Sequence, residues 1–173
     1  MVCERIQTEK MPKLGFGLMR LPQNGGAVDV DGVKRMVDAY MESGFNYFDT
    51  AYVYHGGNSE RVIKEALVDR YPRESFYLAT KLPAWVMNGP EDRDRIFGEQ
   101  LEKCGVEYFD FYLLHSLEDG KNYDCMKSTT ASAGPWRRKN RVRFAISDSP
   151  TTEHRSCWSR CWTVTRRWNL YRS

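Results

Sequence analysis

The 173-residue chain has no long apolar run, because no stretch approaches the eighteen consecutive apolar residues that a membrane-spanning helix needs. The first thirteen residues also lack the apolar segment of a secretory signal peptide. We therefore expect no membrane partner and a cytoplasmic location. The length fits one globular domain and little more.

Cysteines are too scattered for a disulfide framework, since their number is five and no two of them form a C-x-x-C pair. Cys157 and Cys161 lie four residues apart, a spacing that a metal could use only with two further ligands. The sequence therefore gives no indication of a metal site.

Acidic and aliphatic residues are scarce at the C-terminal end. Residues 128–173 contain 10 Lys and Arg against 2 Asp and Glu, whereas residues 1–127 contain 16 against 21. The same end has five residues of the Val, Ile, Leu, Met and Phe set, too few for a packed core, and four of the five tryptophans. We therefore divide the chain into a folded part, residues 1–127, and a basic Trp- and Arg-rich tail, residues 128–173, which we expect to be disordered.

The folded part repeats a pattern of short apolar strands and amphipathic helices. Strands are expected at residues 14–21, 45–48, 75–82 and 108–114, and helices at 28–43, 59–71 and 91–104. Three strands end at intervals of 32 and 34 residues, which is the length of a strand, a crossover helix and two loops. About four βα units therefore predict an α/β fold with a parallel sheet, and the pattern leaves open a doubly wound sheet or an eight-stranded barrel.

The first expected helix illustrates the pattern. One face carries Val33, Met36, Val37 and Tyr40, which we expect to be buried. Asp29 or Asp31 is the candidate N-cap, and Gly44 is the expected stop.

Four polar residues follow or end apolar strands. They are Asp49, Tyr54, Lys81 and His115. In βα folds the carboxyl ends of the strands build the functional site, so these side chains are expected to converge. Each also has an ordinary structural explanation, as a helix cap, a packed ring or a hydrogen-bonded histidine. A lysine within a buried strand needs a counter-charge, and Asp49 is the expected partner of Lys81.

These residues lie in strings that resemble a known family. LGFGLMRLP, GFNYFDTAYVYHGGNSE, FYLATKLP and CGVEYFDFYLLHSL are similar to segments of the aldo/keto reductases, in particular the bacterial branch with a C-terminal ferredoxin-like tail. The resemblance covers residues 11–127. It implies a (β/α)8 TIM barrel that transfers a hydride from NADPH to an aldehyde or ketone. It also implies that Asp49, Tyr54, Lys81 and His115 are catalytic.

The implied roles agree with the chemistry of the side chains. Hydride transfer leaves negative charge on the carbonyl oxygen, so the site must supply a proton and stabilise that charge. Tyr54 would donate the proton, helped by the Lys81 ammonium, which Asp49 holds in place. His115 would orient the carbonyl.

Further residues match the family less specifically. The resemblance implies that Gly17, Leu18, Met19 and Asp49 contact the NADP cofactor, the first three through the backbone. Glu60 matches a family acid near the tyrosine and is equally well explained as a first-turn helix carboxylate.

The resemblance stops before a barrel is complete. A (β/α)8 barrel takes about 250 residues, so residues 1–127 hold roughly its N-terminal half, without the residues that grip the cofactor phosphates. No iron–sulfur cluster is implied. We therefore expect this chain to be an inactive fragment, and the sequence does not identify the carbonyl substrate or the preference between NADP and NAD.

The tail has a candidate origin. When residues 128–173 are back-translated with suitable codons and read one nucleotide earlier, RVRFAISDSP permits QGKVRHLGFS, which resembles the fifth strand of this family. The join near Met126 and Lys127 suits the loss of one adenine. We interpret the tail as an out-of-frame translation, a frameshift, in which the tryptophans have no function.

Two alternatives remain at this stage. The ten basic residues of the tail, interleaved with Trp and Tyr, could bind single-stranded nucleic acid, a reading that we rank below the reductase. A half barrel could also form a homo-oligomer, or aggregate, through its exposed strand edges.

Overall fold

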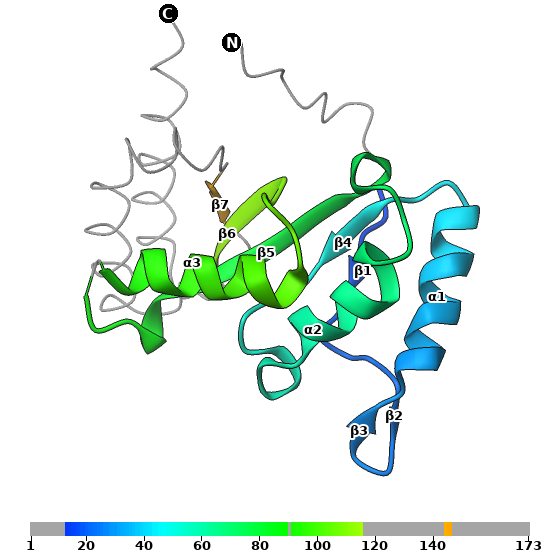
Figure 1. The fold of residues 1–173 in the computed structure, drawn as a ribbon, viewed down its shortest axis with the longest axis horizontal. Helices are drawn as coiled ribbons and strands as arrows, with labels where there is room; N and C mark the ends of the chain where they lie inside the picture. Colours follow the sequence, from blue (N-terminus) through cyan, green and yellow to red (C-terminus); the bar gives the residue numbers. More distant parts are fainter. Residues whose placement is uncertain (1–12, 90, 116–143, 147–173) are drawn as a thin grey trace, which may run out of the picture.

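The computed structural model describes residues 13–89, 91–115 and 144–146, and its main feature is a parallel β-sheet. Five strands lie in the order β1-β4-β5-β6-β7, and every neighbouring pair is parallel (Figure 1). The strands are β1 (Phe16–Gly17), β4 (Tyr47–Asp49), β5 (Tyr77–Pro83), β6 (Phe111–His115) and β7 (Phe144–Ile146). A separate antiparallel hairpin is formed by β2 (Gln23–Asn24) and β3 (Ala27–Val28).

Helices connect β1 to β4, β4 to β5 and β5 to β6, as the repeating pattern predicts. Figure 1 shows α1 (Val30–Glu42), α2 (Ser59–Ile63) and α3 (Glu91–Cys104) ranged along one face of the sheet. Doubly wound sheets carry helices on both faces, whereas a barrel carries them only outside. The described residues therefore form part of a (β/α)8 barrel, with β1 and β7 at the edges of the sheet.

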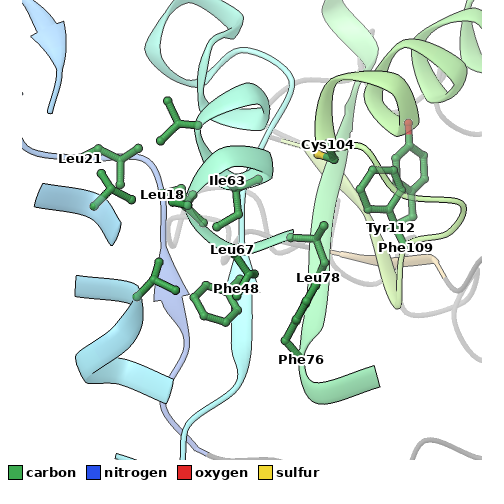
Figure 2. Close-up of a cluster of buried hydrophobic side chains, with 14 of the residues drawn as sticks. Leu18, Leu21, Phe48, Ile63, Leu67, Phe76, Leu78, Cys104, Phe109 and Tyr112 are labelled. Atoms are coloured by element: carbon green, nitrogen blue, oxygen red, sulfur yellow. The ribbon is translucent and has the colours of Figure 1, made fainter. Parts of the chain in front are cut away.

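The hydrophobic core lies between the sheet and these helices. Figure 2 shows Phe48 and Leu78 pointing from the strands toward Ile63 and Leu67 of the second helical segment. All four side chains have no exposed surface. Because side chains alternate across a strand, residues adjacent to Phe48 and Leu78 face the interior of the barrel instead.

Helix α1 confirms most of its predicted features. The Asp29 side chain accepts a hydrogen bond from the Gly32 N–H at 2.9 Å, so Asp29 is the N-cap. Val33, Val37 and Tyr40 are buried, but Met36 is 45% exposed, so the prediction that Met36 is buried was wrong. Met36 lies at the edge of the buried stripe rather than on it.

Three predicted elements differ from the structure, and one of them, the strand expected at residues 108–114, is Phe111–His115. The strand expected at residues 14–21 is only Phe16–Gly17, because the chain turns after Gly17 while the Leu18 N–H still bonds the Asp49 carbonyl at 2.9 Å. The helix expected at residues 59–71 is α-helical only over Ser59–Ile63 and continues as a π-helical turn, Lys64–Val68.

Strand β7 lies in the tail that the sequence predicts to be disordered. It pairs with β6 in register, with Leu113 opposite Ala145. The expectation of disorder is therefore wrong for these three residues, since main-chain hydrogen bonding to an open strand edge needs no large core. The rest of the tail, with its tryptophans and all of its basic residues, lies outside the described residues.

Within the described ranges, no helix is long and apolar enough to cross a bilayer.

Candidate active site

Three neighbouring strands bring the predicted residues to one edge of the sheet. Asp49 ends β4, Lys81 lies near the end of β5, and His115 ends β6. Tyr54 begins a turn, Tyr54–Gly57, five residues beyond the end of β4. Since parallel strands end at the same edge, the structure places the four side chains together, as the sequence predicts.

Lys81 is the centre of this cluster, and its side chain is only 5% exposed. Its ammonium forms an ion pair with the Asp49 carboxylate and donates to the Thr50 carbonyl oxygen at 2.9 Å. The same nitrogen lies 4.8 Å from the centre of the Tyr54 ring. The expected counter-charge for the buried lysine is thus confirmed as Asp49.

His115 closes the other side of the cluster and is 7% exposed. Its ring lies edge-on to the Tyr54 ring, with 5.6 Å between the ring centres. The centre of the Trp85 ring lies 4.9 Å from the centre of the His115 ring, and Trp85 is 43% exposed. Sequence reasoning missed Trp85, although its position shortly after the Lys81 strand was a usable signal.

The segment after β1 borders the same site, because Gly17 lies in register with Asp49. A Cβ atom added to Gly17 would meet nothing within 4 Å, and Met19 is 58% exposed. Leu18 is fully buried, and its N–H and carbonyl already bond Asp49 and Ser59. Gly17 and Met19 therefore leave backbone accessible to a ligand, whereas Leu18 is committed to the fold.

A second polar cluster lies behind the site, on the helix-covered face of the sheet. The Glu60 oxygen Oε1 accepts hydrogen bonds from Thr80 Oγ1 and Gln100 Nε2, each at 2.7 Å. The Tyr112 hydroxyl donates to Gln100 Oε1 at 2.6 Å. Glu60, Thr80, Gln100 and Tyr112 are all fully buried, and we refer to them as the rear network.

The rear network also contacts the site itself, since Gln100 Nε2 lies 3.1 Å from the Lys81 carbonyl oxygen. Glu60 lies in the first turn of α2, and it also belongs to the network behind the site. The two descriptions that the sequence leaves open therefore apply together. The sequence signal for Gln100 was a polar residue on the apolar face of α3, between Ile96 and Cys104.

Burial controls the acid–base properties of this region. Burial raises the pKa of the Glu60 carboxyl, although hydrogen bonds from Thr80 and Gln100 oppose the shift. Burial and then the nearby Asp49 charge raise the pKa of Tyr47, which lies deeper in the barrel interior, to about 12. The described part of the chain holds no group of three or more His, Cys, Asp or Glu side chains placed to bind a metal ion.

Comparisons with known proteins agree with this architecture. The family model described as "Aldo/keto reductase family" matches residues 13–128. The aldo/keto reductase of Klebsiella pneumoniae, solved in complex with NADPH, superposes with a TM-score of 0.69 at 22% identity, over 87% of this chain and 50% of that one. The described residues therefore have the fold of part of such a barrel, and the chain belongs to the aldo/keto reductase family.

Relatives of known activity have different substrates. The 9,11-endoperoxide prostaglandin H2 reductase of Trypanosoma cruzi is 32% identical over 121 residues, covering 69% of this chain and 39% of its own length. The NAD/NADP-dependent indole-3-acetaldehyde reductase of Schizosaccharomyces pombe is 37% identical over 112 residues, covering 61% of this chain and 35% of its own length. The chain therefore spans well under half the length of these relatives.

Proposed function

We propose that this chain carries the proton-donating half of an active site that transfers a hydride from NADPH to an aldehyde or ketone. The observation that carries the proposal is the convergence of Asp49, Lys81, Tyr54 and His115 at the carboxyl edge of β4, β5 and β6. A structural ion pair alone does not explain why a phenol ring lies against the buried ammonium and an imidazole lies against that phenol ring.

Each side chain has a role that follows from its contacts. Tyr54 donates the proton to the carbonyl oxygen, and the Lys81 ammonium beside its ring favours the phenolate that remains. Asp49 pairs with the Lys81 ammonium and fixes its position. His115, held between two aromatic rings, orients the carbonyl and stabilises its developing charge.

The residues at this edge fit a nicotinamide cofactor. When bound, the cofactor supplies the hydride, which the protein has no group to provide. Gly17 and Met19 would contact it through their backbones, and Asp49 through its partly exposed carboxylate. The NADPH complex of the Klebsiella relative supports this assignment.

We further propose that this chain alone does not catalyse the reduction of an aldehyde or ketone. It spans 50% or less of its relatives, and an incomplete barrel holds its ligands weakly. NADPH consumption with a reactive aldehyde should be undetectable for the chain alone. A rate comparable to that of a full-length relative would contradict this part of the proposal.

The catalytic roles are testable in a completed barrel. Residues 13–115 would be joined to the remaining C-terminal part of the Schizosaccharomyces pombe reductase, and folding checked by cooperative unfolding. In this chimera Tyr54→Phe should lower kcat/KM by about 10²- to 10⁴-fold, because a positioned general acid contributes that much.

Tyr52→Phe is the matched control, since the Tyr52 hydroxyl donates to Glu99 at 2.6 Å, away from Lys81. It should leave the rate largely unchanged. A folded chimera in which Tyr54→Phe is as active as the parent would disprove the proposed role of Tyr54.

The tail assignment is also a proposal. We propose that residues 128–173 are translated out of frame, and sequencing the DNA around the codons for Met126 to Ser128 tests it. A confirmed reading frame without a family-like alternative frame would reject it.

A further inference from the structure

The residue after Tyr54 has an unusual backbone. His55 has φ 52° and ψ 43°, and it is the only residue other than glycine with a positive φ in the described ranges. Gly56 and Gly57 follow with φ 64° and 87°. Left-handed conformations are unfavourable for residues with a side chain, so something outside the turn must hold His55 there.

The His55 imidazole supplies that attachment. Its Nε2 accepts a hydrogen bond from the Leu21 N–H at 3.2 Å, across 34 residues of sequence. The side-chain amide of Gln23 lies 3.2 Å from Nδ1. Leu21 is buried in the core and 6% exposed, so the ring is attached to a fixed part of the fold.

These contacts determine where the imidazole proton lies. Since a backbone N–H can only donate, Nε2 must be unprotonated, and a neutral ring then carries its proton on Nδ1. Rotation of the Gln23 amide presents its oxygen to that proton. The structure therefore requires the Nδ1–H tautomer of His55.

We propose that His55 is a positioning residue that latches the turn after Tyr54 to residues 21–23 and thereby aims the Tyr54 ring at Lys81 and His115. The proposal rests on the proposed function of Tyr54 as proton donor. Backbone hydrogen bonds hold the two ends of the turn, from the Tyr54 N–H to the Ala51 carbonyl and from the Asn58 N–H to the His55 carbonyl, whereas the His55 side chain attaches the turn to a distant segment. The latch also links Tyr54 to the segment that continues from Gly17 and Met19. It therefore fixes the proton-donating residue relative to the segment that is proposed to face the cofactor.

Two substitutions separate the latch from the backbone conformation. Gln at position 55 places Oε1 where His55 has Nε2, so His55→Gln keeps the acceptor for Leu21. Asn reaches only to the position of Nδ1, so His55→Asn loses that acceptor, although Asn tolerates a positive φ better than Gln. If His55 acts as a latch, His55→Gln should preserve the parent structure better than His55→Asn. If relief of backbone strain alone matters, His55→Asn should preserve it better.

The test uses the full chain and needs neither cofactor nor turnover. Nitrogen-detected NMR at pH 8 should find His55 as the Nδ1–H tautomer. His55→Asn should speed hydrogen exchange at the Leu21 amide by about tenfold and weaken the cross-relaxation between the Tyr54 and His115 rings. His55→Gln should keep both readouts near those of the parent, with unfolding cooperativity confirming that each variant folds.

Three outcomes would overturn the proposal: an Nε2–H tautomer, equal readouts for the two variants, or an unchanged Tyr54–His115 contact in His55→Asn. None of them depends on whether Tyr54 donates a proton. Failure of the latch and failure of the proposed function, which the chimera tests, are therefore distinguishable.

Discussion

Strands β4 and β5 carry two polar clusters of opposite character on their two faces. On the barrel-interior face, Asp49 and Lys81 form an ion pair whose carboxylate is 27% exposed. On the helix-covered face, the adjacent residues Thr50 and Thr80 are fully buried and hydrogen-bonded to side chains of α2. One-residue alternation along each strand is enough to separate the two clusters.

The difference shows how one scaffold combines reactivity with rigidity. The interior cluster consists of groups whose charge can change, next to solvent from which a ligand can arrive. The rear network consists mainly of neutral donors and acceptors that fix positions, and Glu60 is its one ionisable carboxylate. A rigid hydrogen-bonded layer behind a reactive group keeps that group in place.

The largest expected effect concerns the two partners of the interior ion pair. Asp49→Asn should destabilise the chain by ~3 kcal/mol, because it leaves a 5% exposed ammonium without its counter-charge. Lys81→Met should cost less, ~1–2 kcal/mol, because the Asp49 carboxylate that remains can reach water. Denaturant unfolding at pH 7 measures both values. Equal losses, or a larger loss for Lys81→Met, would mean that burial does not govern this pair.

Two substitutions of Glu60 should separate the effect of losing its charge from the effect of losing its hydrogen bonds on the free energy of unfolding. Glu60→Ala should cost ~2–3 kcal/mol, since it removes the carboxylate oxygen that accepts hydrogen bonds from the buried Thr80 hydroxyl and Gln100 amide. Glu60→Gln keeps an acceptor oxygen and should cost under ~1 kcal/mol at pH 5.

The parent and Glu60→Gln should also differ in how their stability depends on pH, and the raised pKa of Glu60 determines the sign of that difference. Burial raises the folded-state pKa of Glu60 above its usual value near 4.5, so the folded state binds the proton more tightly. The contribution of Glu60 to stability is therefore lost as the pH rises through the folded pKa. Unfolding of Glu60→Gln and the parent at pH 5 and pH 8 should show the variant gaining relative stability at pH 8. A relative gain at pH 5 instead would contradict the raised pKa.

The smallest expected effect is at a surface ion pair that belongs to neither cluster. Lys64 and Asp69 lie 2.8 Å apart with side chains 42% and 49% exposed. Asp69→Asn should change the free energy of unfolding by less than ~0.5 kcal/mol, because solvent screens exposed pairs. This variant calibrates the other unfolding measurements, and a loss as large as that of Asp49→Asn would show that exposure is a poor guide in this protein.

Local pattern was sufficient for the parts of the fold that depend on neighbours in sequence. The α3 boundaries, the Asp29 cap and the strand ends at Asp49 and His115 follow from periodicity and turn residues. The pairing of Lys81 with Asp49 was also predictable, because a buried lysine has few alternatives.

Features that depend on distant contacts were not predictable in this way. The π-helical turn Lys64–Val68 has an ordinary helical sequence, and the attachment of His55 to Leu21 spans two elements. Gln100 lies on the apolar face of α3, but its partners Glu60 and Tyr112 come from other elements and could not be identified from the sequence. Sequence patterns reflect the intrinsic preference of each residue. The conformation and contacts at these positions are instead determined by residues that are distant in sequence and pack against them.

Strand β7 has a consequence for how such sheets grow. The ladder between β6 and β7 joins main-chain atoms, which every residue except proline supplies in full. An open strand edge of this kind pairs with an extended backbone and does not require a particular amino-acid sequence. The open flank of this sheet can thus pair with an extended segment of the polypeptide that follows it.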